Sequence, residues 1–216
     1  MRIRRPVFLT ALVLASATVA MGQAAAPLKL EQTIELPDVQ GRIDHMSIDI
    51  AGQRLFVSAF GNNTLEVVDL KAGKRAHTIS GLKEPQGALY IADKNRLFVA
   101  SDKDGTVKVF DGTSFQLLKT VEYGDDADNL RYDSARERVY VGFGGGALGE
   151  MDTDGQKIGE TKLDAHPESF QLEKGSSRID VNLPGSRKVA VVDREAHLAI
   201  DPEHLFHLES SRSAFR

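Results

Sequence analysis

The chain has 216 residues, of which 41% are hydrophobic and 27% charged, with a formal net charge of −4. This composition is typical of soluble globular domains and permits one sizeable hydrophobic core. The acidic balance disfavours nucleic acid as a partner, since phosphate backbones are also negative. The sequence has no cysteine, which excludes disulfides, thiolate metal sites and lipid attachment through a thiol.

Residues 1–22 have the pattern of a cleavable signal peptide. Arg2, Arg4 and Arg5 precede an uncharged run over 6–20, and small residues follow it. The run is shorter than the roughly 20 residues that a membrane-spanning helix needs, which makes an uncleaved anchor the weaker alternative. We therefore expect a periplasmic or secreted bacterial protein with no membrane contact after cleavage, and the lack of disulfides fits a periplasm.

A pattern of four short strands then returns about every 42 residues. The stretch RLFVASDKDGTVKVFD, residues 96–111, reads as a β-hairpin with Asp104 and Gly105 at its turn. Matching apolar strands occur at 55–57, 97–99, 139–141 and 179–181. Each is followed by an aspartate that we expect to form a turn by accepting backbone N–H bonds: Asp69, Asp111, Asp152 and Asp193.

The second strand of each unit is apolar on both faces, so each sheet needs cover on both sides. Stacking four-stranded sheets around an axis provides that cover. We therefore predict an all-β fold, a β-propeller of four-stranded antiparallel blades over residues 28–194. Its parts are expected to be an orphan strand at 30–36, blades at 41–82, 83–124 and 125–165, and a partial blade at 166–193.

These repeats resemble those of the YVTN β-propeller family, also called YncE-like. The family's Tyr-Val-Thr-Asn tetrapeptide aligns approximately with residues 56–59, 98–101, 140–143 and 180–183. WD-type repeats match less well, since the chain has no Trp. The resemblance implies a seven-bladed propeller, often exported, in a family where many members have no known activity.

About four blade equivalents can be counted, which leaves two interpretations: a ring closed with four blades, or part of a seven-bladed propeller forming an open arc. We favour the arc. Residues 195–216 form an anomalous tail without a closing-strand pattern, and Asp180 stands where the other units have Phe56, Phe98 and Tyr140. An arc would leave an open blade edge through which copies could self-associate.

Candidate binding residues precede the first strand of each unit. The repeat places Asp44, Gln86, Asp128 and Glu168 at one equivalent position, and His45 and Asn129 follow two of them. All six would meet at the mouth of a central channel, where propellers bind ligands. Asp44, Asp128 and Glu168 could hold a divalent cation through carboxylate oxygens, as in lactonase-type propellers. The alternative is a polar, water-filled mouth that holds no cofactor.

Other motifs carry less weight. Residues 144–149, GGGALG, match the letters of a dinucleotide-binding loop, but they lie in a hairpin instead of opening a helix. His197, His204 and His207 fall in the anomalous tail. We predict an exported, non-catalytic binding or scaffold protein for a small ligand or a periplasmic protein partner. The alternative is a metal-dependent lactonase or hydrolase.

Overall fold

The computed structural model describes residues 28–200. Residues 28–32 belong to a separate unit and have no regular structure. The predicted signal peptide, residues 1–22, lies outside the described residues, as do His204, His207 and the end of the predicted tail. Over the described range, no helix is long and apolar enough to cross a membrane.

Residues 33–200 contain four antiparallel sheets of four strands each. The first sheet consists of β1 (Met46–Asp49), β2 (Arg54–Ala59), β3 (Thr64–Asp69) and β4 (Lys74–Ile79). The second consists of β5 (Pro85–Ile91), β6 (Arg96–Ser101), β7 (Thr106–Asp111) and β8 (Leu117–Glu122). The third consists of β9 (Leu130–Asp133), β10 (Arg138–Phe143), β11 (Ala147–Asp152) and β12 (Lys157–Lys162). The fourth consists of β13 (Ser169–Leu172), β14 (Arg178–Leu183), β15 (Lys188–Asp193) and β16 (Leu198–Ile200).

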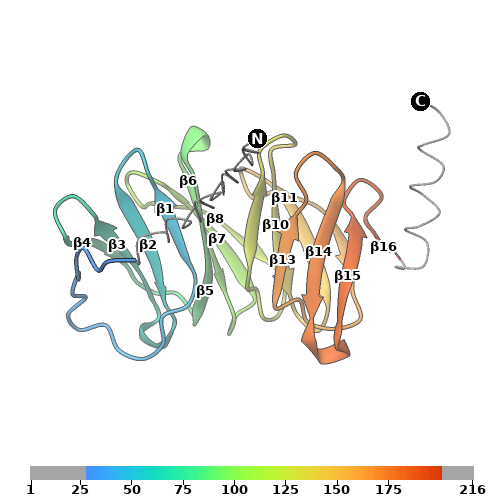
Figure 1. Cartoon of the computed structure of the whole chain (residues 1–216), viewed down its shortest axis with the longest axis horizontal. Coiled ribbons are helices and arrows are strands. Elements are labelled where there is room, and N and C mark those ends of the chain that lie inside the picture. Colours follow the sequence, from blue (N-terminus) through green and yellow to red (C-terminus); the bar gives the residue numbers. More distant parts are fainter. Residues whose placement is uncertain (1–27, 201–216) are drawn as a thin grey trace, which may run out of the picture. The chain divides into compact units, whose positions relative to one another are not determined.

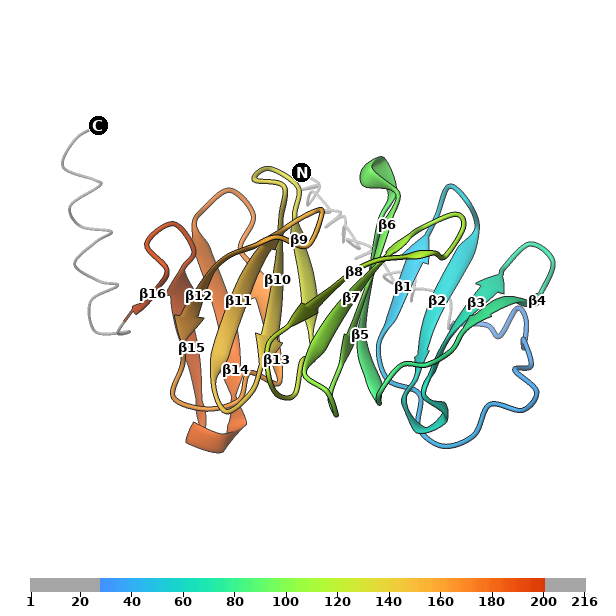
Figure 2. The same cartoon turned by 180° about the vertical axis from the view of Figure 1, so that it is seen from behind.

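Hydrogen-bonded neighbours follow chain order in every sheet, so each sheet is a meander. A register shift recurs at the same place between the third and fourth strands of the first three sheets. Successive sheets lie side by side in chain order (Figures 1 and 2). This is the arrangement of β-propeller blades, which confirms the predicted all-β fold and fits part of a propeller.

The hydrophobic core lies between successive sheets. Each buried cluster joins the aromatic residue of one second strand to two apolar residues of the next: Phe56 with Leu97 and Val99, Phe98 with Val139 and Val141, and Tyr140 with Ile179 and Val181. Equivalent repeat positions therefore occupy equivalent places. Alternate residues of β6 and β10 belong to different clusters, so these strands are covered on both faces, as their sequences predict.

The place of Asp180 in the fourth sheet explains why a carboxylate is tolerated at a position that is aromatic in the other sheets. Ile179, Val181 and Leu183 on β14 are buried, whereas Asp180 between them is exposed. One face of β14 is covered by the third sheet, and the other is open to solvent. Asp180 lies on the open face, so its carboxylate keeps its hydration at a position where Phe98 is fully buried.

Two expectations about strands need correction. Residues 30–36, expected to form an orphan closing strand, form no strand. The fourth sheet is instead closed by β16, which pairs with Val191, Val192 and Asp193 of β15 and lies in the segment expected to lack such a strand. A strand forms where a neighbour supplies hydrogen bonds, and β16 occupies the outer edge of β15. Its three residues are too few to show a pattern in sequence.

The four repeated aspartates form turns, as predicted. The carboxylate of Asp69 accepts the N–H of Ala72 at 2.8 Å, and backbone N–H groups two or three residues further on donate to Asp111, Asp152 and Asp193. These turns fix the link between the third and fourth strands of each sheet.

Candidate functional site

The candidate site begins where the chain enters the first strands of the sheets. Backbone bonds from Asp44 N–H to Ser58 O (2.9 Å) and from Ser58 N–H to His45 O (3.0 Å) hold this segment against β2. The same pair recurs in the third sheet, from Asp128 N–H to Gly142 O (2.9 Å) and from Gly142 N–H to Asn129 O (3.0 Å). The repeat therefore fixes the backbone at both positions in the same way.

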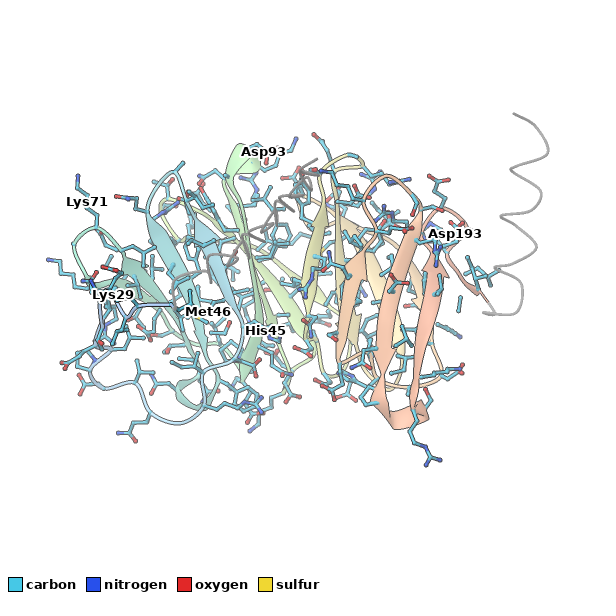
Figure 3. All side chains as sticks on the ribbon, in the orientation of Figure 1. Lys29, His45, Met46, Lys71, Asp93 and Asp193 are labelled. Atoms are coloured by element: carbon cyan, nitrogen blue, oxygen red, sulfur yellow. The ribbon has the colours of Figure 1, made fainter. Side chains whose placement is uncertain are left out.

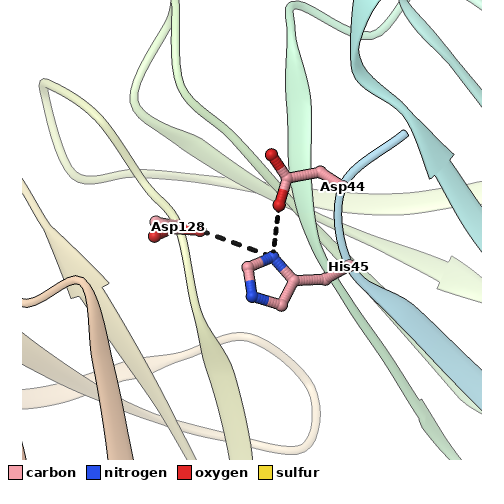
Figure 4. A group of neighbouring side chains, drawn as sticks. All are labelled: Asp44, His45 and Asp128. Carbon is pink, nitrogen blue, oxygen red and sulfur yellow. Dashed lines mark ion pairs between the residues drawn. The ribbon is translucent and has the colours of Figure 1, made fainter. Parts of the chain in front are cut away.

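Three of the predicted side chains form one cluster. His45 Nδ1 lies 2.7 Å from Asp44 Oδ1 and 3.7 Å from Asp128 Oδ1 (Figure 4). One ligand atom from each residue lies within 4.8 Å of the other two. Asp44 is also paired with Arg42, whose Nη2 lies 2.7 Å from Asp44 Oδ2. Residues 84 positions apart in the chain thus meet because the first and third sheets each contribute the same repeat position.

Asp128 is the buried member of the cluster, with 4% of its surface exposed. Burial raises the pKa of Asp128 to about 6; His45 opposes this shift and the carboxylate of Asp44 adds to it. Asp128 Oδ1, Asn129 Oδ1 and His45 Nδ1 are buried and make no hydrogen bond within residues 28–200. The contact between His45 and Asp44 is close but not aligned as a hydrogen bond.

The other three predicted residues surround this cluster in different ways. Asn129 Nδ2 donates to Asp128 Oδ2 at 2.9 Å and to the backbone carbonyl of Glu168. Gln86 accepts the N–H of His45 through its backbone carbonyl (3.3 Å), while its side chain donates to Asp126. The side chain of Glu168 is exposed and is not among the described ligand atoms of the cluster. The predicted trio of Asp44, Asp128 and Glu168 is therefore replaced by Asp44, His45 and Asp128.

Gly87 lets the second sheet approach this site. A Cβ atom at Gly87 would lie 2.1 Å from the backbone oxygen of Asp128, so no other residue fits without movement. β5 and the segment before β9 are thus in backbone contact beside the cluster.

Sequence reasoning did not find His166. Its Nδ1 lies 2.7 Å from the carbonyl oxygen of Gly144 and 3.4 Å from Asp126 Oδ2, and Asp126 also accepts a bond from Gln86. His166 precedes β13 by a few residues and has no counterpart of its kind in the other repeats. Nothing in the repeat pattern could have marked it.

The donor set of the cluster is mixed. Two carboxylates and an imidazole offer oxygen and nitrogen ligands, which suit Zn²⁺ or Mn²⁺ better than the all-oxygen set that Ca²⁺ prefers. A ligand carrying an ammonium group would also match, because the two carboxylates can accept its N–H hydrogen bonds.

No family model matches the chain. It is 24% identical over 132 residues to eukaryotic translation initiation factor 3 subunit I of Drosophila grimshawi, covering 60% of this chain and 40% of that protein. It is 35% identical over 97 residues to WD repeat-containing protein 55 of Danio rerio, covering 43% of this chain and 24% of that protein. The chain thus spans less than half the length of these curated relatives.

Solved structures are similar over most of the chain. Hydrazine synthase of Kuenenia stuttgartiensis has a TM-score of 0.68 at 19% identity, covering 80% of this chain and 51% of that chain. The computationally designed protein Ika4 has a TM-score of 0.63 at 18% identity, covering 74% of this chain and 96% of that chain. Identities this low bear on the fold alone. With the stacked sheets and the WD repeat-containing relative, they define a β-propeller protein.

Proposed function

We propose that this protein is a non-catalytic binding or scaffold propeller, and that the Asp44–His45–Asp128 cluster takes a small cationic ligand. This proposal rests on the buried atoms Asp128 Oδ1, Asn129 Oδ1 and His45 Nδ1, which have no hydrogen-bond partner among the described residues. Leaving a buried carboxylate oxygen unpaired costs about 1–3 kcal/mol, and a cation or ammonium group would remove that cost at Asp128 Oδ1. Backbone hydrogen bonds to β2 and β10 hold the cluster's two segments in place, as a binding site requires.

A protein partner is part of the same proposal. One relative is, by its name, a subunit of a translation initiation factor, and the other contains WD repeats. Both names agree with a scaffold role for propeller repeats in this chain. Export through residues 1–22 to a periplasm, and membership of the YVTN group, remain proposals supported by the sequence pattern.

The second candidate is a metal-dependent lactonase or hydrolase, and the same cluster favours it. If Asp44, His45 and Asp128 hold a divalent cation, that cation would supply Lewis acidity for polarising an ester carbonyl. Both candidate functions therefore require the cluster to bind a cation, and they differ in whether the protein then hydrolyses a substrate.

Calorimetric titration of chelator-treated protein with Zn²⁺, Mn²⁺ and Ca²⁺ tests both. We expect one stoichiometric site, preferring Zn²⁺ or Mn²⁺, in the wild type and in the control E168Q, since Glu168 lies outside the cluster. D128N should bind at least about tenfold more weakly, the equivalent of 1.4 kcal/mol. Absence of stoichiometric binding would remove the cation site. Metal-dependent lactone hydrolysis that D128N abolishes would overturn the non-catalytic proposal.

A further inference from the structure

Apart from the Asp44–His45–Asp128 cluster, a cleft lies between the third and fourth sheets, at the ends where β9, β13 and β15 finish. Its volume is about 740 Å³, within the roughly 300–1,000 Å³ of small-molecule sites. His45 lies before the start of a first strand, whereas Asp193 ends a third strand, so this cleft is at the opposite end of the sheets from the cluster. Figure 3 labels both residues. The cleft shares no lining residue with the Asp44–His45–Asp128 cluster.

Basic side chains outnumber acidic side chains by one in the lining of this cleft. Four basic residues and three acidic residues line it: Arg131, Arg136, Lys174, Arg194, Asp133, Glu173 and Glu195. The acids are already paired. Asp133 contacts Arg136 (3.1 Å) and Arg194 (3.4 Å), Glu195 contacts Arg136, and Glu173 lies 3.7 Å from Arg178 outside the lining.

Arg131 and Lys174 have no such partner. Neither makes an ion pair with any residue in the described range. Arg131 donates to the carbonyl of Leu130 and lies over the ring of Phe170, with 5.6 Å from its Cζ to the ring centroid. Burial lowers the pKa of Arg131, because its charge is poorly solvated, and the carboxylate of Asp128 opposes this shift. A desolvated guanidinium held on an aromatic ring is oriented to meet an anion.

Arg194 gives the independent sign of a ligand. Only 3% of its side chain is exposed, and it lines the cleft. Its Nη2 donates to the backbone carbonyls of Glu173 and Ser176, which fixes the turn that forms one wall. Its Nη1 and Nε make no hydrogen bond with the described residues, although Nε lies 3.4 Å from Asp133 Oδ2. A buried guanidinium with a free donor is costly unless an acceptor completes its coordination.

Both arginines depart from the repeat. The residue after the turn-forming aspartate is Leu70, Gly112 and Thr153 in the first three units but Arg194 in the fourth. Arg131 likewise stands where the other units have Ser47, Leu89 and Gln171. The other sheets stack without a charge at either position, and positions that break the pattern of a fold concentrate at functional sites.

We propose that this cleft binds a small organic or inorganic oxyanion, carrying carboxylate or phosphate groups, through Arg131, Lys174 and Arg194. The guanidinium of Arg131 supplies a planar pair of donors, Lys174 supplies a point charge at the rim, and Arg194 holds the turn that carries Lys174 in place. The hydroxyls of Ser134 and Ser176 lie in the same lining and can complete the set.

Isothermal titration of the full chain with citrate and with inorganic phosphate, at ionic strength held constant with NaCl, tests this site. We expect saturable binding of at least one anion at one site per chain. R131Q should weaken it at least about tenfold, because the neutral amide loses the charge-assisted hydrogen bonds to the anion. K174Q should weaken it less, because Lys174 is exposed and bonds as a point charge.

The matched control is K71Q, which removes the same charge from a lysine in a turn of the first sheet, far from the lining (Figure 3). It should bind as the wild type does. R194K keeps the positive charge but loses the planar donor set of the guanidinium that holds the turn. It should weaken anion binding while circular dichroism shows a folded chain. No saturable binding by either anion, or equal affinity in R131Q/K174Q and the wild type, would overturn the proposal.

Discussion

At the scale of single residues, Glu150 on β11 is a buried carboxylate that lacks part of its hydrogen bonding. It is 6% exposed; Arg138 Nε lies 3.3 Å from its Oε1 and His197 Nδ1 lies 3.4 Å from its Oε2. Its Oε2 has no hydrogen bond among the described residues. Burial raises the pKa of Glu150, although His197 and Arg138 oppose the shift. Ionised Glu150 therefore works against folding at neutral pH.

We predict that E150Q is more stable than the wild type at pH 7, by up to about 1 kcal/mol. The sign follows from proton linkage. Since the pKa of Glu150 is raised on folding, its neutral form contributes stability below the unfolded pKa, and that contribution is lost as pH rises through the folded pKa. The difference between E150Q and the wild type should thus vanish in acid. Thermal melts between pH 4 and pH 8 measure it.

The control for this prediction is E160Q, which neutralises an exposed carboxylate on the neighbouring strand β12. It should change the melting temperature little at any pH. If E150Q were instead less stable at pH 7, the pairs with Arg138 and His197 would outweigh burial. Those two partners are 36% and 41% exposed, so water can replace the carboxylate for both.

At the scale of the strand, Phe98 and Asp180 occupy the same position of the repeat under different cover. Phe98 on β6 is fully buried between the second and third sheets, whereas Asp180 on β14 faces solvent. We predict that F98A destabilises the protein by about 3–5 kcal/mol, because a large cavity forms in a two-sided core. D180A should stay within about 0.5 kcal/mol of the wild type, as surface changes do.

Urea unfolding followed by circular dichroism compares the two substitutions. The pair is informative because both residues occupy the same position of the repeat, one between two sheets and the other on an open face. A similar cost for both would mean that Asp180 makes structural contacts, and a small cost for F98A would mean that the sheets do not depend on each other for burial.

The repeat explains which features could be predicted from the sequence. Two-sided burial is visible in the apolar runs of β6 and β10, so the stacked sheets could be predicted from local pattern. Periodicity also placed Asp44 and Asp128 at equivalent backbone positions, but equivalence does not fix side-chain direction, and Glu168 therefore stayed outside the cluster. Arg194 was missed because it breaks the repeat, and β16 because pairing with β15 defines it more than its own residues do.

At the scale of the whole protein, the first and fourth sheets each have a face with no cover among the described residues, and the face of the fourth sheet carries Asp180 on the same side as Val189. Met46 and Ile48 on β1 are 57% and 53% exposed, and Val189 on β15 is 58% exposed. Their repeat equivalents are packed: Ala88 and Tyr90 belong to the cluster facing the preceding sheet, and Val107 to the cluster facing the next. The two faces are therefore of the kinds that meet each other inside the chain.

We expect these faces to associate between copies, with the first sheet of one chain against the fourth sheet of another. Such a contact repeats the packing between successive sheets and is heterologous, so it can continue beyond a dimer. Sedimentation velocity of the wild type should show association that grows with concentration. Each of I48K and V189K should shift the protein to monomer, because a lysine there would have to be desolvated in the contact. L118K, on the outer strand β8, places the same charge at an exposed leucine away from both faces and should leave association unchanged. A wild type that remains monomeric at every concentration would show that exposed apolar faces of this size are tolerated in solution, as isolated surface residues are.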